Sequence, residues 1–554
     1  MFIKRKLLYK KRKAERAKMD SYYLMLALYI FLIYWLIVLV LDRKGILQRY
    51  NISAFGPILM IRTTRGEKLL ERLAEGRLRK RFWRAYANIG TILVLIAMTF
   101  MFILVLLGAY STFTVQPEPT EFNAPRNWLL IPGLNEFIPL CAWVGFVVAL
   151  VVHELSHAVL STVEKIKIKS MGLLVALIPI GAFAEPDSEQ LFGKKEEKEE
   201  KNKVATARER TRILSAGITS NFAVAFIAFA LFFSILFAIQ PISDKVLFVH
   251  DVVEGSAAEK AGIETGMFIT KVDGSKVTSA TLDKMNKAIE EKKGIIFDVL
   301  NKRGKQTEIK VEGGYEYEGV RIAGVEEGFP AANAGMKAGM SIIMMDDVNI
   351  AGYKDFQNFM NHTTPGQKVE VRTKEKTFLV ELKESVQDNK GFLGVFLVPN
   401  NPLGMCVREF PTKGYLESLR VIPSSFISLS TSGWIWLTLL PFLPLPAGFS
   451  SFNPLLSHLY EPAGVLSFLG GGIFVIADVL FWIGWINFYV GLFNCLPAIP
   501  LDGGYVFREM LKPVLRIGIK EEEKKEKIVK AITTTIAIFV ASAIAFMLVG
   551  PYFL

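Results

Sequence analysis

The chain has 554 residues, 51% of them hydrophobic and gathered into long runs, which is typical of a polytopic membrane protein. The net charge of +12 does not indicate nucleic acid, because the basic residues flank the hydrophobic runs, where they set topology and contact anionic lipid headgroups. No nucleic-acid motif and no Cys-x-x-Cys pair is present, so we expect no nucleic-acid partner, no disulfide framework and no cysteine metal site.

Residues 1–87 combine basic segments with one apolar run. The tail 1–18 carries nine Lys/Arg, and residues 21–41 are long and apolar enough to cross a bilayer. The stretch 43–86 carries twelve Lys/Arg, and Gly66–Arg81 has the pattern of an amphipathic surface helix. We predict a first transmembrane helix followed by a cytoplasmic amphipathic segment.

Residues 88–240 are predicted to form a transmembrane half that contains the motif His-Glu-Leu-Ser-His and a re-entrant hairpin. Lys165–Glu185 is too irregular for a span, so we expect short strands or a re-entrant hairpin, which membrane depth tolerates only where protein or water contacts the backbone. The mixed-charge run 193–203 is expected to be a solvated loop. The predicted spans of this half are 88–110, 138–160 and 213–239.

An internal repeat follows. The segment 254–274 realigns with 327–347 at a constant offset of 73 residues. A repeat of this size predicts two copies of one small domain, which we place at 246–315 and 318–386. The pattern Ala-Gly-(x3)-Gly-Met, followed by a strand that ends in Asp, resembles PDZ domains of the protease-associated type, which bind extended peptides at a sheet edge.

The C-terminal part returns to apolar runs. In 420–477 a proline-broken run (424–446) and a short Gly-rich run (464–477) predict amphipathic or re-entrant membrane segments. The segment 478–510 is predicted as a span, 478–496, that leads into Asn-Cys-Leu-Pro-Ala-Ile-Pro-Leu-Asp-Gly-Gly. Residues 511–554 supply a cytoplasmic loop and a last span at 528–550. The predicted fold is a polytopic α-helical membrane protein with about six transmembrane helices, plus two small extracytoplasmic α+β PDZ-like domains.

The distribution of basic residues predicts the orientation in the cell membrane. Cytoplasmic loops collect Lys/Arg, and 43–86, 161–212 and 505–527 carry twelve, eleven and seven of them. These segments are expected in the cytoplasm and the repeats outside the cell. The nine basic residues of the tail 1–18 oppose this arrangement. Translation from Met19, or a first helix that does not span the membrane, would remove the conflict. Detection of an intact Met1 by mass spectrometry would exclude translation from Met19.

Three ionisable residues interrupt the apolar run 147–160. His153 and His157 are four residues apart, so on a helix both imidazoles face the same way. Two neutral imidazoles can hold a zinc ion, and the carboxylate of Glu154 beside them can move protons. Burying such groups in a membrane helix is costly, which indicates function. Taken alone, however, a short His-Glu-x-x-His match is equally consistent with chance.

A catalytic zinc usually takes three protein ligands, so a third has to come from elsewhere. Asp502 is the best candidate, because it follows the cytoplasmic end of a span in a turn that can bend back to the helices. The alternative is an ordinary turn aspartate. Asp478 lies about 36 Å from Asp502 along the helix axis and is excluded. The remaining histidines fall on the other side of the membrane and are interpreted as surface residues: His250, His362 and His458.

The two motifs together resemble those of one protein family. His-Glu-Leu-Ser-His in one span, followed after a later span by Asn494, Pro497, Asp502 and Gly503 as N-x2-P-x4-D-G, resembles the site-2 protease family of intramembrane zinc metalloproteases. The resemblance covers about residues 88–510. It implies one Zn2+ per chain, held by His153, His157 and Asp502, with Glu154 as the catalytic acid/base.

The resemblance extends to two further features. Asn494 looks like a substrate-positioning or oxyanion-side group of the family motif, and Gly181–Pro186 resembles the family's Gly-rich hairpin, with an alanine where a second glycine is common. Asn221, inside the span 213–239, is interpreted either as a substrate contact or as an interhelical hydrogen-bonding residue.

The predicted function is hydrolysis of peptide bonds within or near transmembrane segments of membrane proteins, as in regulated intramembrane proteolysis. The active site is expected near the cytoplasmic side. A substrate helix has its amides satisfied internally, so it has to unwind, as an added strand on the hairpin around 168–186, before its carbonyls become accessible. The expected partners are transmembrane substrates, the lipid bilayer, and peptide or C-terminal segments at the PDZ-like domains. The family resemblance implies that these domains filter substrates by the size of their ectodomain.

Two alternatives stay open. One is a catalytically silent membrane scaffold that binds peptides through its PDZ-like domains; the complete set of candidate ligands favours the enzyme. The other is a membrane protease of another His-Glu-x-x-His family, in which a later Glu is commonly the third ligand. The Leu-Asp-Gly-Gly turn argues against that family.

Overall fold

The computed structural model divides the chain into two compact units, Met1–Phe232 with Val479–Leu554, and Phe233–Asp478. The predictions for the tail 1–18, for most of the loop 193–203 and for the run 428–446 lie outside the described residues. The structure describes residues 29–63, 66–117, 119, 124–128, 132–133, 135, 137–193, 203–253, 256–278, 280–281, 285, 294–301, 304–312, 319–326, 328–337, 339–385, 390–398, 403–427, 454–519 and 521–553.

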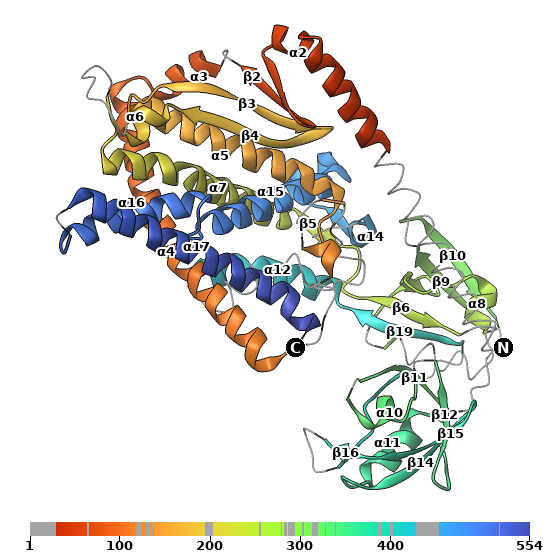
Figure 1. Cartoon of the computed structure of the whole chain (residues 1–554). Coiled ribbons are helices and arrows are strands. Elements are labelled where there is room, and N and C mark those ends of the chain that lie inside the picture. The colour runs from red at the N-terminus through yellow and green to blue at the C-terminus, as the bar shows by residue number, and fades with distance from the viewer. Residues whose placement is uncertain are drawn as a thin grey trace. The chain divides into compact units, whose positions relative to one another are not determined.

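Long apolar helices dominate the first unit (Figure 1). Each predicted span except the first corresponds to one of them. The first predicted span, 21–41, is helical from residue 29, and its earlier part lies outside the described residues. Among the described residues five helices are long and apolar enough to cross a membrane: α4 (Arg77–Val115), η3 with α5 (Leu140–Ala142 and Trp143–Val163), α7 (Ala207–Leu236), α15 (Gly472–Asn494), and α17 with η6 (Glu522–Val549 and Gly550–Tyr552).

Two predicted helix boundaries are wrong. The single amphipathic helix predicted over Gly66–Arg81 is divided, because α3 (Gly66–Ala74) ends before Gly76 and α4 begins at Arg77. Gly76 has a φ of 102°, which glycine adopts without strain. The helix α15 begins at Gly472, so residues 472–477 belong to this span and not to a separate segment. The apolar run continues through Asp478, and one acidic residue does not end a helix.

A four-stranded antiparallel sheet accompanies the helices. Its strands are β1 (Ile52–Phe55), β2 (Ile58–Thr63), β3 (Ile168–Ala176) and β4 (Ile178–Pro186), in the order β1-β2-β3-β4. The predicted hairpin within 165–185 is confirmed as β3 and β4, which lie alongside α5 (Figure 1). The hairpin of β1 and β2 was not predicted, although the Gly56-Pro57 pair between two short apolar runs is a turn signal. Among the strands that the structure describes, none pairs with the outer edge of β4.

Small residues allow the helices of this unit to approach closely. A Cβ added at Gly145 on α5 would lie 2.6 Å from the carbonyl oxygen of Trp482 on α15. A Cβ at Gly90 on α4 would lie 2.1 Å from the hydroxyl oxygen of Thr219 on α7. Such contacts are typical of membrane helices, whose association depends on packing rather than on the hydrophobic effect.

A buried ionic cluster joins three helices where α5 ends. The side chain of Glu164 has no exposed surface, and its Oε2 accepts a hydrogen bond from Arg84 Nη2 of α4 at 2.7 Å. Its Oε1 accepts from Arg84 Nε at 3.1 Å and from Arg212 Nη1 of α7 at 2.9 Å. The carboxylate therefore fixes α4, α5 and α7 relative to one another.

The second unit contains two sheets of the same layout, with strand orders β10-β9-β7-β6-β19 and β15-β14-β12-β11-β18. The first comprises β6 (Val246–Val252), β7 (Phe268–Val272), β9 (Ile295–Leu300), β10 (Gln306–Val311) and β19 (Met405–Phe410), with α8 (Ala257–Ala261). The second comprises β11 (Val320–Val325), β12 (Ser341–Met345), β14 (Lys368–Thr373), β15 (Thr377–Glu381) and β18 (Val395–Val398), with α10 (Pro330–Asn333) and α11 (Tyr353–Asn361). Beside these orders, the short strand β8 (Ser275–Lys276) pairs with β7 in the first sheet, as β13 (Val348–Asn349) pairs with β12 in the second sheet.

The structure confirms the internal repeat. Asp273 and Asp346 both have a positive φ, 49° and 47°. Their Oδ1 atoms accept backbone hydrogen bonds from Ile296 at 2.9 Å and from Glu370 at 2.7 Å. Equivalent residues thus make equivalent turns in the two copies.

The predicted limits of the repeats at 315 and 386 are too early. β19 pairs with β6, so the last strand of the first copy comes after the whole second copy in the chain. β18, at Val395–Val398, pairs with β11 and completes the second copy. Strand pairing at these distances depends on tertiary contacts, which a sequence alignment of the two copies does not contain.

The remaining short elements are α2 (Ile46–Arg49), η2 (Pro125–Asn127), α6 (Ser188–Phe192), β5 (Ile239–Pro241), β16 (Lys383–Glu384), β17 (Gly391–Phe392), α12 (Thr412–Ile427), α14 (Pro454–Ser457), β20 (Tyr460–Pro462), η5 (Gly464–Leu469) and α16 (Asp502–Arg516).

The Glu164 cluster gives a testable prediction. Glu164→Ala leaves Arg212, whose side chain is only 12% exposed, without its buried partner. We expect a loss of about 3 kcal/mol of stability, measured by thermal or denaturant unfolding in detergent. Glu312→Ala is the control, because Glu312 is a surface carboxylate paired with Lys310 and should change stability little. Equal unfolding midpoints for both variants would contradict the structural role of Glu164.

Candidate metal centre

Three potential ligand atoms converge in the first unit. His153 Nε2 lies 2.9 Å and His157 Nε2 lies 3.1 Å from Asp502 Oδ2. The two Nε2 atoms are 3.2 Å apart. Ligand atoms that share one tetrahedral zinc at 2.0–2.2 Å are about 3.3 Å apart. Both histidines are buried. Among the described residues, His153, His157 and Asp502 form the group of His, Cys, Asp or Glu side chains whose ligand atoms lie close enough to share a metal ion, and we call this group the trio.

The histidines are brought together by helix geometry, and Asp502 by a tight turn. Four residues separate His153 and His157 on α5, which places them on one face. Asp502 is the first residue of α16. A Cβ at Gly503 would lie 2.4 Å from the carbonyl oxygen of Cys495, and one at Gly504 would lie 2.5 Å from the backbone nitrogen of Ile499. The two glycines therefore allow the start of α16 to fold back against the turn that ends α15.

Gly217 of α7 leaves space for the trio. A Cβ at this position would lie 2.6 Å from Nε2 of His153 and 2.6 Å from Nε2 of His157. Only a residue without a side chain keeps both nitrogens clear. Two imidazoles and a carboxylate form a common donor set for catalytic zinc. The residues present thus fit this metal, both in chemistry and in the space around the ligand atoms.

Hydrogen bonds orient both imidazoles. His157 Nδ1 donates to the backbone carbonyl of Ile213 at 2.7 Å, which leaves the lone pair on Nε2. The amide nitrogen of Asn221 lies 3.3 Å from His153 Nδ1. Asn221 Oδ1 is buried and has no hydrogen-bond partner among the described residues. Rotating this amide by 180° places Oδ1 where it accepts from Nδ1–H, so that Nε2 of His153 also keeps its lone pair.

The Asp502 carboxyl favours its charged form. Burial opposes ionisation, but the charge and hydrogen bonds of His157 and His153, which are protonated when no metal is bound, outweigh this effect and hold the pKa of Asp502 below its usual range. An ionised carboxylate is the form that a metal requires.

Glu154 lies next to the trio in sequence and binds the sheet. Its Oε2 accepts a hydrogen bond from the backbone nitrogen of Ala184 in β4 at 2.9 Å. Two residues further along α5, Ser156 donates to Ser220 Oγ at 2.5 Å, and Ser220 in turn bonds the Tyr86 hydroxyl at 2.8 Å. The sequence analysis did not predict this chain of hydroxyl groups across α5, α7 and α4. The serines within the apolar runs were the sequence feature that could have indicated it.

The other predicted residues lie outside the trio. Asn494 ends α15, and its side chain forms no hydrogen bond with the described residues. The three remaining histidines are exposed, as predicted: His250, His362 and His458. Among the described residues none of them belongs to a group of side chains with metal-ligand spacing. Gly217 was missed, because a single glycine in a helical run does not reveal which side chains it faces.

Comparisons with known proteins place the chain among peptidases. The sequence profile described as peptidase family M50 matches residues 141–540, which include the whole trio. A Neisseria meningitidis protein named "Putative zinc metalloprotease" is 22% identical over 324 residues, which cover 54% of this chain and 69% of that protein. An uncharacterized protein of Methanocaldococcus jannaschii is 26% identical over 279 residues, which cover 49% of this chain and 67% of that protein. A Staphylococcus haemolyticus protein named "Probable CtpA-like serine protease" is 39% identical over 72 residues, 13% of this chain and 14% of that protein.

The space at Gly217 gives the second prediction. Gly217→Ala places a methyl group against both Nε2 atoms, so we expect the purified protein to retain less than about half of its metal while it stays helical. Elemental analysis and circular dichroism measure the two properties. Gly518→Ala is the control, because a Cβ there meets no atom within 4 Å. Full metal content in Gly217→Ala would show that the trio does not hold the ion.

Proposed function

Because the chain belongs to peptidase family M50, the site-2 proteases, and is a multi-pass zinc metalloprotease, we propose that it hydrolyses peptide bonds within or near transmembrane segments of other membrane proteins. We propose His153, His157 and Asp502 as the ligands of one zinc ion and Glu154 as the catalytic acid/base. The observation that supports this proposal best is the convergence of three ligand atoms from α5 and α16 within 3.2 Å.

The roles of the residues follow from their chemistry. When bound, zinc supplies Lewis-acid polarisation of the scissile carbonyl and acidifies a water molecule. Glu154 accepts a proton from the attacking water and transfers it to the leaving amine. The hydrogen bonds that His157 Nδ1 donates to the Ile213 carbonyl and that His153 Nδ1 donates to the rotated Asn221 amide keep both imidazoles in the tautomer that leaves Nε2 unprotonated.

The free edge of β4 supports a site for an unwound substrate. An extended segment can pair with an exposed sheet edge through its backbone. β4 is the edge strand of its sheet, and Ala184 of β4 contacts Glu154 directly. A substrate strand on this edge would therefore present its carbonyls beside the proposed acid/base. This arrangement resolves the difficulty that a transmembrane helix has all its amides satisfied internally.

The two repeats are proposed as PDZ-like domains that bind peptide or C-terminal segments outside the cell. β18 and β19 are edge strands, and Phe396 of β18 is 56% exposed. An exposed edge of this kind is the feature that strand addition uses. If the basic segments lie in the cytoplasm, the proposed zinc site lies near the cytoplasmic side of the membrane and the repeats lie outside the cell. There the repeats can select substrates for regulated intramembrane proteolysis.

Zinc content and cleavage test the proposed roles together. We expect about one zinc per purified wild-type chain, and clearly less in His157→Ala and Asp502→Ala, by elemental analysis. Glu154→Gln should retain zinc but cleave a transmembrane peptide at least about 100-fold more slowly, because only proton transfer is removed.

Two outcomes would change the proposal. Absence of metal from the wild type after exposure to zinc would favour a membrane scaffold without catalytic activity. Loss of zinc in His157→Ala but not in Asp502→Ala would keep the enzyme and require another third ligand.

Asn221 has its own test. Asn221→Leu removes the proposed acceptor of the His153 Nδ1 proton, and we expect zinc affinity to fall about 10- to 100-fold in chelator competition. Asn487→Leu is the control, because it removes another buried amide, on α15, whose donation among the described residues is to Ile483 of its own helix. Unchanged zinc affinity together with a higher KM would identify Asn221 as a substrate contact instead.

A further inference from the structure

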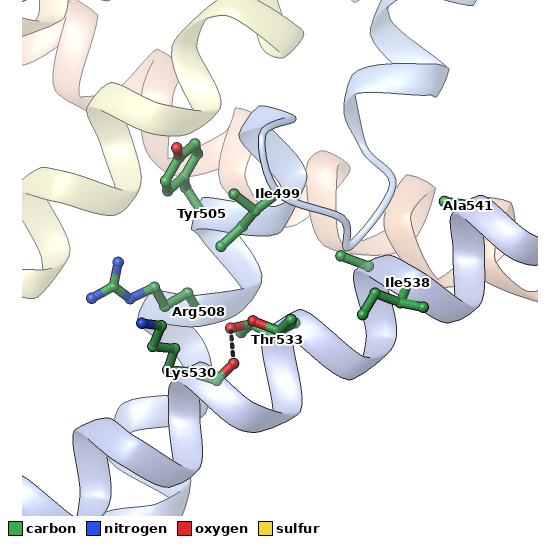
Figure 2. Close-up of a pocket in the computed structure, with 9 residues that line it drawn as sticks. Ile499, Tyr505, Arg508, Lys530, Thr533, Ile538 and Ala541 are labelled. Carbon is green, nitrogen blue, oxygen red and sulfur yellow. Dashed lines mark hydrogen bonds between the residues drawn. The ribbon is translucent and has the colours of Figure 1, made fainter.

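A pocket of about 580 Å³ lies between α16 and α17, and none of the three metal-site side chains lines it. Figure 2 shows the basic groups of Arg508 and Lys530 at one end of the pocket, and Ile538 and Ala541 further along α17. The pocket thus has a cationic end and an apolar end. Its lining residues are Ile499, Tyr505, Arg508, Lys530, Thr533, Thr534, Ala537, Ile538 and Ala541.

The cationic end has more positive than negative charge. Arg508 pairs with Glu526 at 3.4 Å, and Lys512 pairs with Glu526 at 3.0 Å and with Glu509 at 3.1 Å. Glu509 is in turn neutralised by Arg210. Lys530 forms no ion pair with any residue that the structure describes, and its side chain is exposed. The hydroxyl of Tyr505 likewise forms no hydrogen bond with the described residues. The pocket therefore presents an unneutralised ammonium group and a free hydroxyl, which suit an anionic group with several acceptor oxygens.

From its cationic end to its apolar end, the pocket extends along α17 by about the length of one lipid chain in a membrane leaflet. Lys530 and Ala541 are eleven residues apart on α17, which corresponds to about 16 Å along the helix axis. Half of the hydrocarbon core of a bilayer is about 15 Å thick. Ile538 of this end is 62% exposed, so no other described part of the protein covers it.

The helix α16 has the pattern of a helix that lies at the membrane surface. Met510, Val514 and Ile517, the last of them the residue that caps the end of the helix, share one face, and they are 40%, 61% and 89% exposed. A helix with such an exposed apolar face and basic residues on the other lies in the interface between water and lipid. This places Arg508 of α16, and with it the cationic end of the pocket, at the depth of lipid headgroups.

We propose that this pocket binds one anionic phospholipid, with its phosphate at Arg508, Lys530 and Tyr505 and one acyl chain along Ile538 and Ala541. A soluble phosphate compound would use only the cationic end. Ile499 and Tyr505 stand three positions before and after Asp502, so a bound lipid contacts both sides of the turn that carries this residue.

Lipid binding to the purified, delipidated full-length protein tests the proposal. Native mass spectrometry in detergent counts bound lipids during titration with phosphatidylglycerol or with phosphatidylcholine of the same acyl chains. We expect one phosphatidylglycerol to bind more tightly than phosphatidylcholine. Lys530→Gln should weaken phosphatidylglycerol binding about fivefold, which corresponds to about 1 kcal/mol for one basic residue at a lipid surface.

Matched variants separate the pocket from general surface charge. Lys524→Gln removes the same charge from the same helix outside the pocket and should leave binding unchanged. Lys530→Arg should restore binding, which distinguishes loss of charge from misfolding. Ile538→Trp fills the apolar end and keeps the charges, so it should weaken phosphatidylglycerol binding as well.

Several results would overturn the proposal. One is equal binding of the two lipids. Another is equal weakening by Lys530→Gln and Lys524→Gln. Displacement of phosphatidylglycerol by millimolar inorganic phosphate, with no effect of Ile538→Trp, would identify a site for a soluble anion. Lipid mass is measured without zinc or proteolysis, so this test stands or fails independently of the proposed enzymatic function.

Discussion

The convergence of His153, His157 and Asp502 is the interaction on which the rest of the helical unit depends. The carboxylate is 345 residues away from His157 in the chain, yet its Oδ2 lies 3.1 Å from the imidazole nitrogen. Polar groups buried among membrane helices are costly unless they pair or bind a metal. The fold therefore has to hold α5 and the start of α16 in one fixed relation, and its remaining features serve that requirement.

Two kinds of contact hold this relation. Glycines allow backbones and ligands to approach: Gly217 leaves space for the imidazoles, and Gly503 lets the start of α16 lie against the end of α15. Buried carboxylates tie the helices together at their ends. Glu164 joins α5 to α4 and α7, and Glu509 of α16 accepts from Arg210 of α7 at 2.7 Å. Each carboxylate is compensated by arginine, because an unpaired buried charge would be strongly destabilising.

The sheet and the proposed lipid pocket lie on elements that also carry the site. β4 contacts α5 through the hydrogen bond from Ala184 to Glu154. The pocket is lined by Ile499 and Tyr505, on the turn and the helix that position Asp502. Substrate pairing at β4 and lipid binding between α16 and α17 would therefore act on the two halves of the same centre.

Local sequence signals determined the parts of this protein that depend on local geometry. The spacing of His153 and His157 predicts their common face, the apolar runs predict five of the helices, and the constant offset between the repeats predicts two copies of one unit. Asp502 could be nominated from its motif. Contacts between distant segments needed the tertiary structure, because nothing in the local pattern specifies the partner. These include the pairing of β19 with β6, the hairpin of β1 and β2 added to β3, and Gly217 facing the imidazoles. A periodic pattern reports which face of an element is apolar, whereas the identity of the neighbour depends on how the whole chain packs.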